Sequence, residues 1–142
     1  MLTPYWTISA KSGTAQYSGV IHGVGAVQAS SVRFDLTGTV SYNVDFSAQS
    51  YTGTMAIKGA DGSGGSRDFG SFAITGGSPL GANVGQSNPL GDFASVSENG
   101  TFVGQLSNRM FGPDGEEMAG VFSITVGGPK TSLAGVAVAK RN

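Results

Sequence analysis

Few side chains in this 142-residue sequence have the chemistry of a catalytic or metal-binding group. His22 is the only histidine, and the chain contains no cysteine. Apolar and polar residues alternate over residues 14–22, which places His22 on the polar face of a strand together with Thr, Gln and Ser. We therefore expect a solvated surface histidine rather than a metal ligand or a pH sensor. The sequence contains no G-x-S-x-G elbow, and its spacing builds no Ser-His-Asp arrangement.

The paired carboxylates of Glu116 and Glu117 are the next candidates for acid–base chemistry. Adjacent residues of a strand point to opposite faces, so these two side chains cannot act on one substrate. We expect one of them to cap the turn at Gly112 and Pro113 by accepting hydrogen bonds from backbone N–H groups. We also expect a positive φ angle at Gly112.

Two glycine-rich segments resemble ligand-binding motifs only in part. Residues 62–68 look like one calcium-binding nonapeptide, but Arg67 stands where glycine is needed and several stacked copies are required. Gly23 and Gly25 lack the third glycine and the acidic partner of a dinucleotide site. We interpret the first segment as a flexible hairpin tip, and an enzyme is the weakest of the functional hypotheses.

Composition excludes several broad classes of protein. The chain has 24 glycines, 12% charged residues and a net charge of −1, which argues against nucleic-acid binding and against a basic membrane patch. No apolar run approaches the length of a membrane helix, and residues 1–7 lack the features of a signal peptide. The absence of cysteine favours a bacterial protein slightly, and for an exported protein we expect the signal to lie upstream.

Alternation with a period of two runs through most of the chain. Even-numbered apolar residues from Val32 to Phe46 form one unbroken row, which predicts a single long strand bent at Gly38; a three-residue loop there is the alternative. Asn99 and Gly100 predict a tight hairpin. The predicted strands cover residues 14–22, 32–46, 51–57, 69–75, 93–97, 101–106, 118–126 and 133–139.

These eight strands predict an all-β fold, a single eight-stranded antiparallel up-and-down β-barrel over residues 13–142, preceded by a lead-in segment over residues 1–12. Eight is the number at which side chains just fill the interior, so we expect a packed barrel. A lipocalin-type cavity is the alternative, suggested by Ser95 and Ser97, which parity places inside. Parity also places Phe93, Phe102, Gly104 and Leu106 inside, and we expect Tyr5 and Trp6 to plug the open end or to meet an adjoining domain.

Three segments of the chain have distinctive sequences. They are Thr-Ala-Gln-Tyr-Ser-Gly at 14–19, Gly-Thr-Val-Ser-Tyr-Asn-Val-Asp-Phe at 38–46 with Tyr-Thr-Gly at 51–53 behind it, and residues 100–120. Together they resemble the barrel domain of bacterial surface lipoproteins of the transferrin-binding protein B and factor H-binding protein type. The residues that carry the third resemblance, with the strand that follows, form a structural signature: Phe111, Gly112, Pro113, Glu116, Glu117, Gly120 and Phe122.

The resemblance implies a non-enzymatic binding domain of a protein exported by a Gram-negative bacterium. It implies a place at the cell surface or outside the cell, with the periplasm as the alternative. The partner is then a protein or a small iron-carrying ligand in iron or host-protein acquisition, and haem is the one cofactor suggested. We expect a monomer that does not insert into a membrane.

Loops on a rigid barrel are the natural contact surface for such a partner. The residues that we select in the loops 58–68 and 76–88 are Asp61, Arg67, Asp68, Asn83 and Asn88. The alternative is a structural or adhesion module, without a ligand of its own, inside a larger cell-envelope protein.

Overall fold

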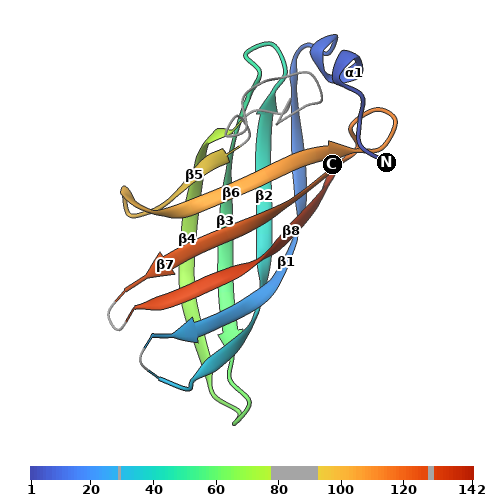
Figure 1. The fold of residues 1–142 in the computed structure, drawn as a ribbon. Coiled ribbons are helices and arrows are strands. Elements are labelled where there is room, and N and C mark those ends of the chain that lie inside the picture. The colour runs from blue at the N-terminus through green and yellow to red at the C-terminus, as the bar shows by residue number, and fades with distance from the viewer. Residues whose placement is uncertain (29, 78–92, 128–129) are drawn as a thin grey trace.

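The chain folds into one closed antiparallel barrel in which every strand pairs with its neighbours in sequence and β8 pairs with β1 (Figure 1). The computed structural model describes residues 1–28, 30–77, 93–127 and 130–142. The strands are β1 (Thr14–Val27), β2 (Arg33–Asp45), β3 (Ser50–Ala60), β4 (Ser66–Gly77), β5 (Phe93–Glu98), β6 (Thr101–Phe111), β7 (Glu117–Val126) and β8 (Thr131–Arg141). The predicted eight-stranded all-β barrel is confirmed.

The second strand shows why alternation was a reliable guide. β2 is continuous through Gly38, as predicted, and Phe34, Leu36, Val40 and Tyr42 along it are buried. A side chain at Gly38 would place its Cβ atom 1.9 Å from the carbonyl oxygen of Ala56 on β3. Only glycine permits this approach between neighbouring strands, so the strand continues through this position without a break.

The start of this row is less regular. Val32 precedes β2 and is 41% exposed, so its predicted inward position is wrong. The parity of a strand does not constrain a residue that lies outside the ladder.

The hairpin at Asn99 and Gly100 is confirmed. Both residues have positive φ angles, 51° and 81°, and Glu98 pairs with Thr101 across the turn. Two residues with φ above zero give the tight turn whose twist matches that of the flanking strands.

A β-bulge behind this hairpin overturns part of the predicted interior. Ser97 pairs with Phe102, but Val96 pairs with Gly104, so Val103 is an extra residue on β6. One extra residue reverses the alternation, so Ala94 and Val96 are buried whereas Ser95 is exposed and Phe102 is 62% exposed. The inward positions predicted for Ser95 and Phe102 are wrong, and Ser97 is half-buried.

A second β-bulge occurs on β4. Lys58 pairs with Asp68 while Ile57 pairs with Gly70, which leaves Phe69 as the extra residue. The bulge turns both Phe69 and Phe72 into the core although their positions differ in parity. The ring of Phe69 meets that of Phe34 edge-on, with 5.4 Å between centroids.

The interior is packed with apolar side chains, as predicted. The largest fully buried ones are Tyr17, Tyr42, Tyr51, Phe72, Ile8, Ile21, Leu36, Met55, Ile57, Ile74, Leu106 and Met110. The lipocalin-type alternative rested on Ser95 and Ser97, and the bulge at Val103 removes that basis.

The lead-in lies across one end of the barrel, where both termini are found (Figure 1). It contains a short helix that the sequence did not predict, α1 (Tyr5–Ser9), whose Ile8 is 2% exposed and belongs to the core. Trp6 is 73% exposed, so it does not plug the open end; the side chain of Tyr5 lies outside the described residues. Among the described residues, no helix has the length and apolar character needed to cross a membrane.

Candidate functional site

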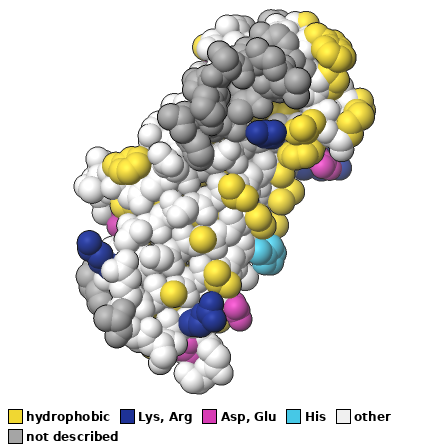
Figure 2. All heavy atoms as spheres, viewed as in Figure 1, with side chains coloured by type: hydrophobic (Ala, Val, Ile, Leu, Met, Phe, Trp, Pro, Cys, Tyr) yellow, Lys and Arg dark blue, Asp and Glu magenta, His cyan; other side chains and the backbone are white. Residues whose placement is uncertain are grey.

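The outward face of β7, β8 and β1 is apolar over its middle part. Five valines stand there, each about half exposed: Val20 (51%), Val24 (52%), Val121 (59%), Val136 (46%) and Val138 (46%). We call this surface the valine wall. Figure 2 shows hydrophobic side chains running along this side of the barrel, with the histidine beside them.

Strand register brings these valines together although they lie up to 118 positions apart in the sequence. Val20 is directly opposite Val138, and Val138 is opposite Ala119 on the other side. Val136 lies in the next row between His22 and Val121. Such contiguous apolar patches on a soluble protein commonly mark a contact surface.

A groove of about 440 Å³ lies between β6 and the part of the wall on β7 and β8. Its lining residues are Ser107, Arg109, Phe111, Ala119, Gly120, Val121, Val136 and Val138. Ala119 is the smallest side chain that faces this groove, and Gly120 contributes only its backbone. Phe111 and Ala119 also line a second hollow of about 550 Å³, which continues towards Gly112, Pro113 and Met1. Glu116, Glu117 and Lys140 also line this second hollow, so the surface becomes mixed in character towards the end of the barrel.

The size of this surface suits a partner that binds reversibly. Five half-exposed valines present roughly 300 Å² of apolar area, in the range of the largest patch on an ordinary monomer. The groove, with Phe111 and Met1, adds to it. Covering an area of this size gives useful binding energy without requiring a permanent interface.

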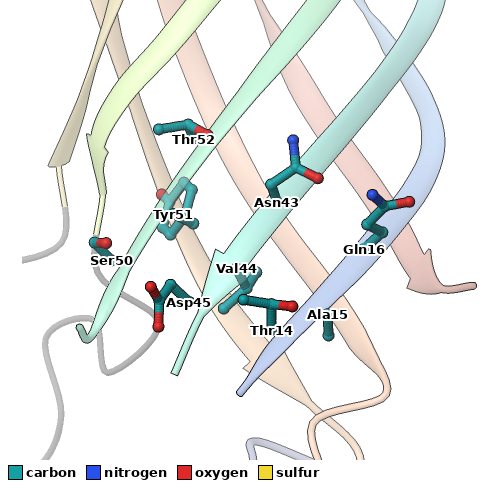
Figure 3. A pocket seen from close by; sticks show the side chains of 9 residues that line it. All are labelled: Thr14, Ala15, Gln16, Asn43, Val44, Asp45, Ser50, Tyr51 and Thr52. Atoms are coloured by element: carbon teal, nitrogen blue, oxygen red, sulfur yellow. The ribbon is translucent and has the colours of Figure 1, made fainter. Parts of the chain in front are cut away.

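The adjoining side of the barrel, next to β1, carries polar side chains instead. Thr37, Thr39, Ser41, Thr52 and Thr54 on β2 and β3 are exposed, and we call this surface the threonine wall. A shallow hollow of about 320 Å³ opens where it meets β1. Figure 3 shows Gln16, Asn43 and Thr52 there on three neighbouring strands, and the register places them in one row.

The signature hairpin, residues 111–117, lies at the end of the barrel and is held by its own hydrogen bonds. Gly112 has a φ of +91°, as predicted, and a carboxylate oxygen of Glu116 accepts the backbone N–H of Asp114 at 3.0 Å. The prediction that one glutamate caps this turn is therefore confirmed, whereas Glu117 points outward at the start of β7, opposite Lys140.

Tyr17 holds the same hairpin from inside the barrel. Its hydroxyl donates a hydrogen bond to the carbonyl oxygen of Gly115 at 2.5 Å. Burial raises the pKa of this hydroxyl, although the nearby Arg141 acts in the opposite direction. The hairpin is thus fixed to the core.

Asp114 ties the hairpin to both ends of the chain. Its carboxylate lies 2.8 Å from Nζ of Lys11 in the lead-in and 3.6 Å from the guanidinium of Arg141 in β8. The hydrogen bond from Lys11 is the main reason why the pKa of Asp114 lies below its ordinary value. These contacts are structural, and they give the signature residues a place in the fold.

Three of the residues predicted to contact a partner lie in the described part of the chain: Asp61, Arg67 and Asp68. Each of them makes a contact within its own hairpin. A carboxylate oxygen of Asp61 accepts hydrogen bonds from Ser63 and from the backbone N–H of Gly65, and these bonds lower the pKa of Asp61. Asp68 accepts the N–H of Gly70 at 2.8 Å. These acidic groups order their own hairpin.

Arg67 also makes a local contact, because its guanidinium lies 4.8 Å from the centre of the Phe69 ring. Asn83 and Asn88 lie outside the described residues. That these loops form a contact surface therefore stays a prediction.

The described part of the chain offers little support for a metal site. It contains no cluster of three or more His, Asp or Glu side chains that could hold a metal ion.

In the core, burial raises the pKa of Tyr42 to about 12, and the side-chain amide of the buried Asn108 is its polar neighbour. His22 is exposed, as predicted, but its setting among valines was not foreseen.

The comparisons with known proteins agree with this architecture. The chain aligns over its whole length with transferrin-binding protein B, isotype 1, from serogroup B Neisseria meningitidis, at 20% identity and a TM-score of 0.55. It aligns over 99% with a point mutant of the vaccine antigen transferrin-binding protein B from Haemophilus parasuis, at 15% identity and a TM-score of 0.51. The fold is that of a transferrin-binding protein B barrel.

The likeness to transferrin-binding protein B is one of structure. It covers 27% and 28% of those two chains, so the present chain spans about a quarter of their length. No family model and no curated protein matches the sequence. The predicted resemblance is confirmed at the level of the barrel, and both matched proteins are named for binding another protein.

Proposed function

We propose that this chain is a binding domain of an exported bacterial surface protein and that it contacts a partner protein through the valine wall. The observation that carries the proposal is the group of five half-exposed valines on three adjacent strands. Nothing inside the barrel requires them, because the inward residues of the same strands form the core. The shared fold with transferrin-binding protein B supports a role in capturing a host protein.

Capture by the immobilised domain tests this proposal. The probes are purified transferrin, with and without iron, and whole serum analysed by mass spectrometry. We expect one protein to be retained by the wild type and by Thr54→Glu, which places a charge on the threonine wall. Val136→Glu should abolish retention, because a charge at the centre of an apolar contact loses its solvation. Equal retention by both variants, or none by the wild type, would contradict the proposal.

Haem is a second candidate ligand, and the setting of His22 favours it. This exposed imidazole stands between Thr37 and Val136, with Val20 and Val24 on the same face of β1. A histidine with valines on three sides offers an axial ligand and a surface for a flat porphyrin ring. Titration with haemin should give saturable binding that is at least tenfold weaker in His22→Ala. Unchanged binding in that variant would exclude this site.

The structural or adhesion module remains the alternative from another functional class. The observation in its favour is that the matched chains are almost four times as long as the aligned region. A domain of this kind would bind neither serum protein nor haem, so failure of both experiments would favour it. Surface exposure is tested separately, by proteinase treatment of intact cells.

A further inference from the structure

The strand β5 is shorter than both of its neighbours, so part of each neighbour lies beyond its reach. The described β5 has 6 residues, whereas β4 has 12 and β6 has 11. It pairs with residues 73–75 of β4, and on β6 its pairing extends as far as Ser107. Because the chain turns back at Asn99 and Gly100, β5 cannot continue along β4. Figure 1 shows β3 and β4 running on past this turn.

The lead-in covers the end of β6 as an added strand. Residues 1–3 lie antiparallel to residues 110–112, with Leu2 opposite Phe111. Two backbone hydrogen bonds, of 2.8 and 3.0 Å, flank this pair. An extended segment of three residues is therefore enough to pair with an edge of this barrel where β5 does not reach.

The corresponding edge of β4, residues 66–72, has no added strand in the described part of the chain, where only β3 pairs with it. The bulge at Phe69 divides this edge, and the carboxylate of Asp68 accepts the N–H of Gly70 at 2.8 Å. Bulges and charges protect an edge against pairing in an arbitrary register. Residues 70–72, next to the hairpin turn, form a stretch as long as the one that the lead-in covers.

We propose that this edge of β4 receives an extended segment of a partner protein as an added strand. The chemistry of the edge names the occupant, because a row of backbone N–H and C=O groups is a template for another extended backbone. Phe69 and Phe72 are buried behind the edge, so the side chains that the segment turns inward should be apolar. The site is separate from the valine wall on β7, β8 and β1, and it goes beyond the function proposed for that wall.

Two side chains beside the edge define the segment further. Phe102 is 62% exposed and lies in one cross-strand row with Ser97 and Ala73. The carboxylate of Glu98 lies 3.9 Å from the position that a Cβ atom would take at Gly70. An exposed aromatic ring favours an apolar contact, and a carboxylate favours a basic one. The expected segment is extended, apolar at alternate positions, and carries a Lys or Arg.

A phage-displayed library of random dodecapeptides, selected on the immobilised whole chain, is the probe. The tightest peptide is then synthesised in two versions, each N-methylated at every second backbone amide, so that together they cover all amides. Alternate amides of an added strand face the edge. One version should therefore lose at least tenfold in affinity, whereas the other should bind as the unmodified peptide does. Equal loss in both versions, or failure to select any peptide, would overturn the proposal.

Amide hydrogen exchange and variants of the chain locate the bound peptide. Exchange should slow at least tenfold at one or more amides of residues 70–72. Phe102→Ser should weaken binding at least tenfold, whereas Trp6→Ser, at an aromatic residue that is 73% exposed on α1, should bind as the wild type does. Thermal melting checks that both variants fold. Protection confined to the valine wall, or equal binding by the two variants, would overturn the proposal and leave partner capture by the wall unaffected.

Discussion

The valine wall and the threonine wall are two outward faces of one barrel, and they differ in side chains rather than in backbone. The strands of both are fully paired, and both cover the same apolar core. Threonine and valine are both β-branched and suit a strand about equally well. The threonine wall therefore shows that this barrel can form with hydroxyl groups outside. The methyl groups of the valine wall have no such structural reason, which points to a contact surface.

The largest effect should come from comparing the two faces of β7. Phe122 is 3% exposed and Val121 is 59% exposed, although they are adjacent. Phe122→Ala should lower the free energy of unfolding by about 3–5 kcal/mol, because it removes a core aromatic ring. Val121→Ala should change it by less than about 1 kcal/mol. Urea denaturation measures both, and a loss below about 1 kcal/mol at Phe122 would contradict its place in the core.

The next effect concerns the signature hairpin. Gly112→Val should lower the free energy of unfolding by about 1–3 kcal/mol, because a branched side chain strains the positive φ. A Cβ atom there would also lie 2.2 Å from the capping carboxylate of Glu116. Gly64→Val is the matched control, since φ is +89° but no atom lies within 4 Å. Thermal melting should show a larger loss at Gly112, and equal losses would mean that the cap contributes little.

An exchange between the two walls sharpens the comparison. Val136→Thr and Thr54→Val keep the shape of each side chain and exchange its polarity. Both should change the free energy of unfolding by less than about 0.5 kcal/mol, as exposed substitutions usually do. Only Val136→Thr should weaken partner capture. If Val136→Thr instead destabilised the isolated domain strongly, the valines would have a structural role.

The smallest effect should appear at acid pH. The pKa of Asp114 is lowered in the folded state, so its ionised form is favoured there. Its contribution to stability is present above the ordinary value of 3.8 and is lost as pH falls through the lowered folded-state pKa. Asp114→Asn should thus be slightly less stable than the wild type at pH 7 and equal to it near pH 2. A difference that persists in acid would exclude the carboxylate as its source.

Local sequence rules predicted the strands and most of the interior. The alternation from Phe34 to Phe46, the turn at Asn99 and Gly100 and the positive φ of Gly112 depend on residues close together in the chain. Side chains alternate across a strand whatever its neighbours are, so parity separates inside from outside. The eight-stranded barrel followed from these local signals.

The two bulges show where local rules end. Val103 and Phe69 each add one residue to a strand and reverse its parity, so Phe102 lies outside and Phe69 inside. Alternation in the sequence looks the same with or without the added residue. The choice depends on which pairing lets the neighbouring strands and the core fit together.

The sequence by itself determined the class of fold, the near-neutral charge and the outward direction of most polar residues. Only the tertiary structure decided that Val20 lies beside Val138 and Val136 beside Val121. These neighbours arise when β8 closes on β1 and pairs with β7, and register between strands is set by the whole barrel. A contact surface on a sheet is built across strands, perpendicular to the chain. For that reason the loops were predicted from the sequence, whereas the valine wall emerged from the fold.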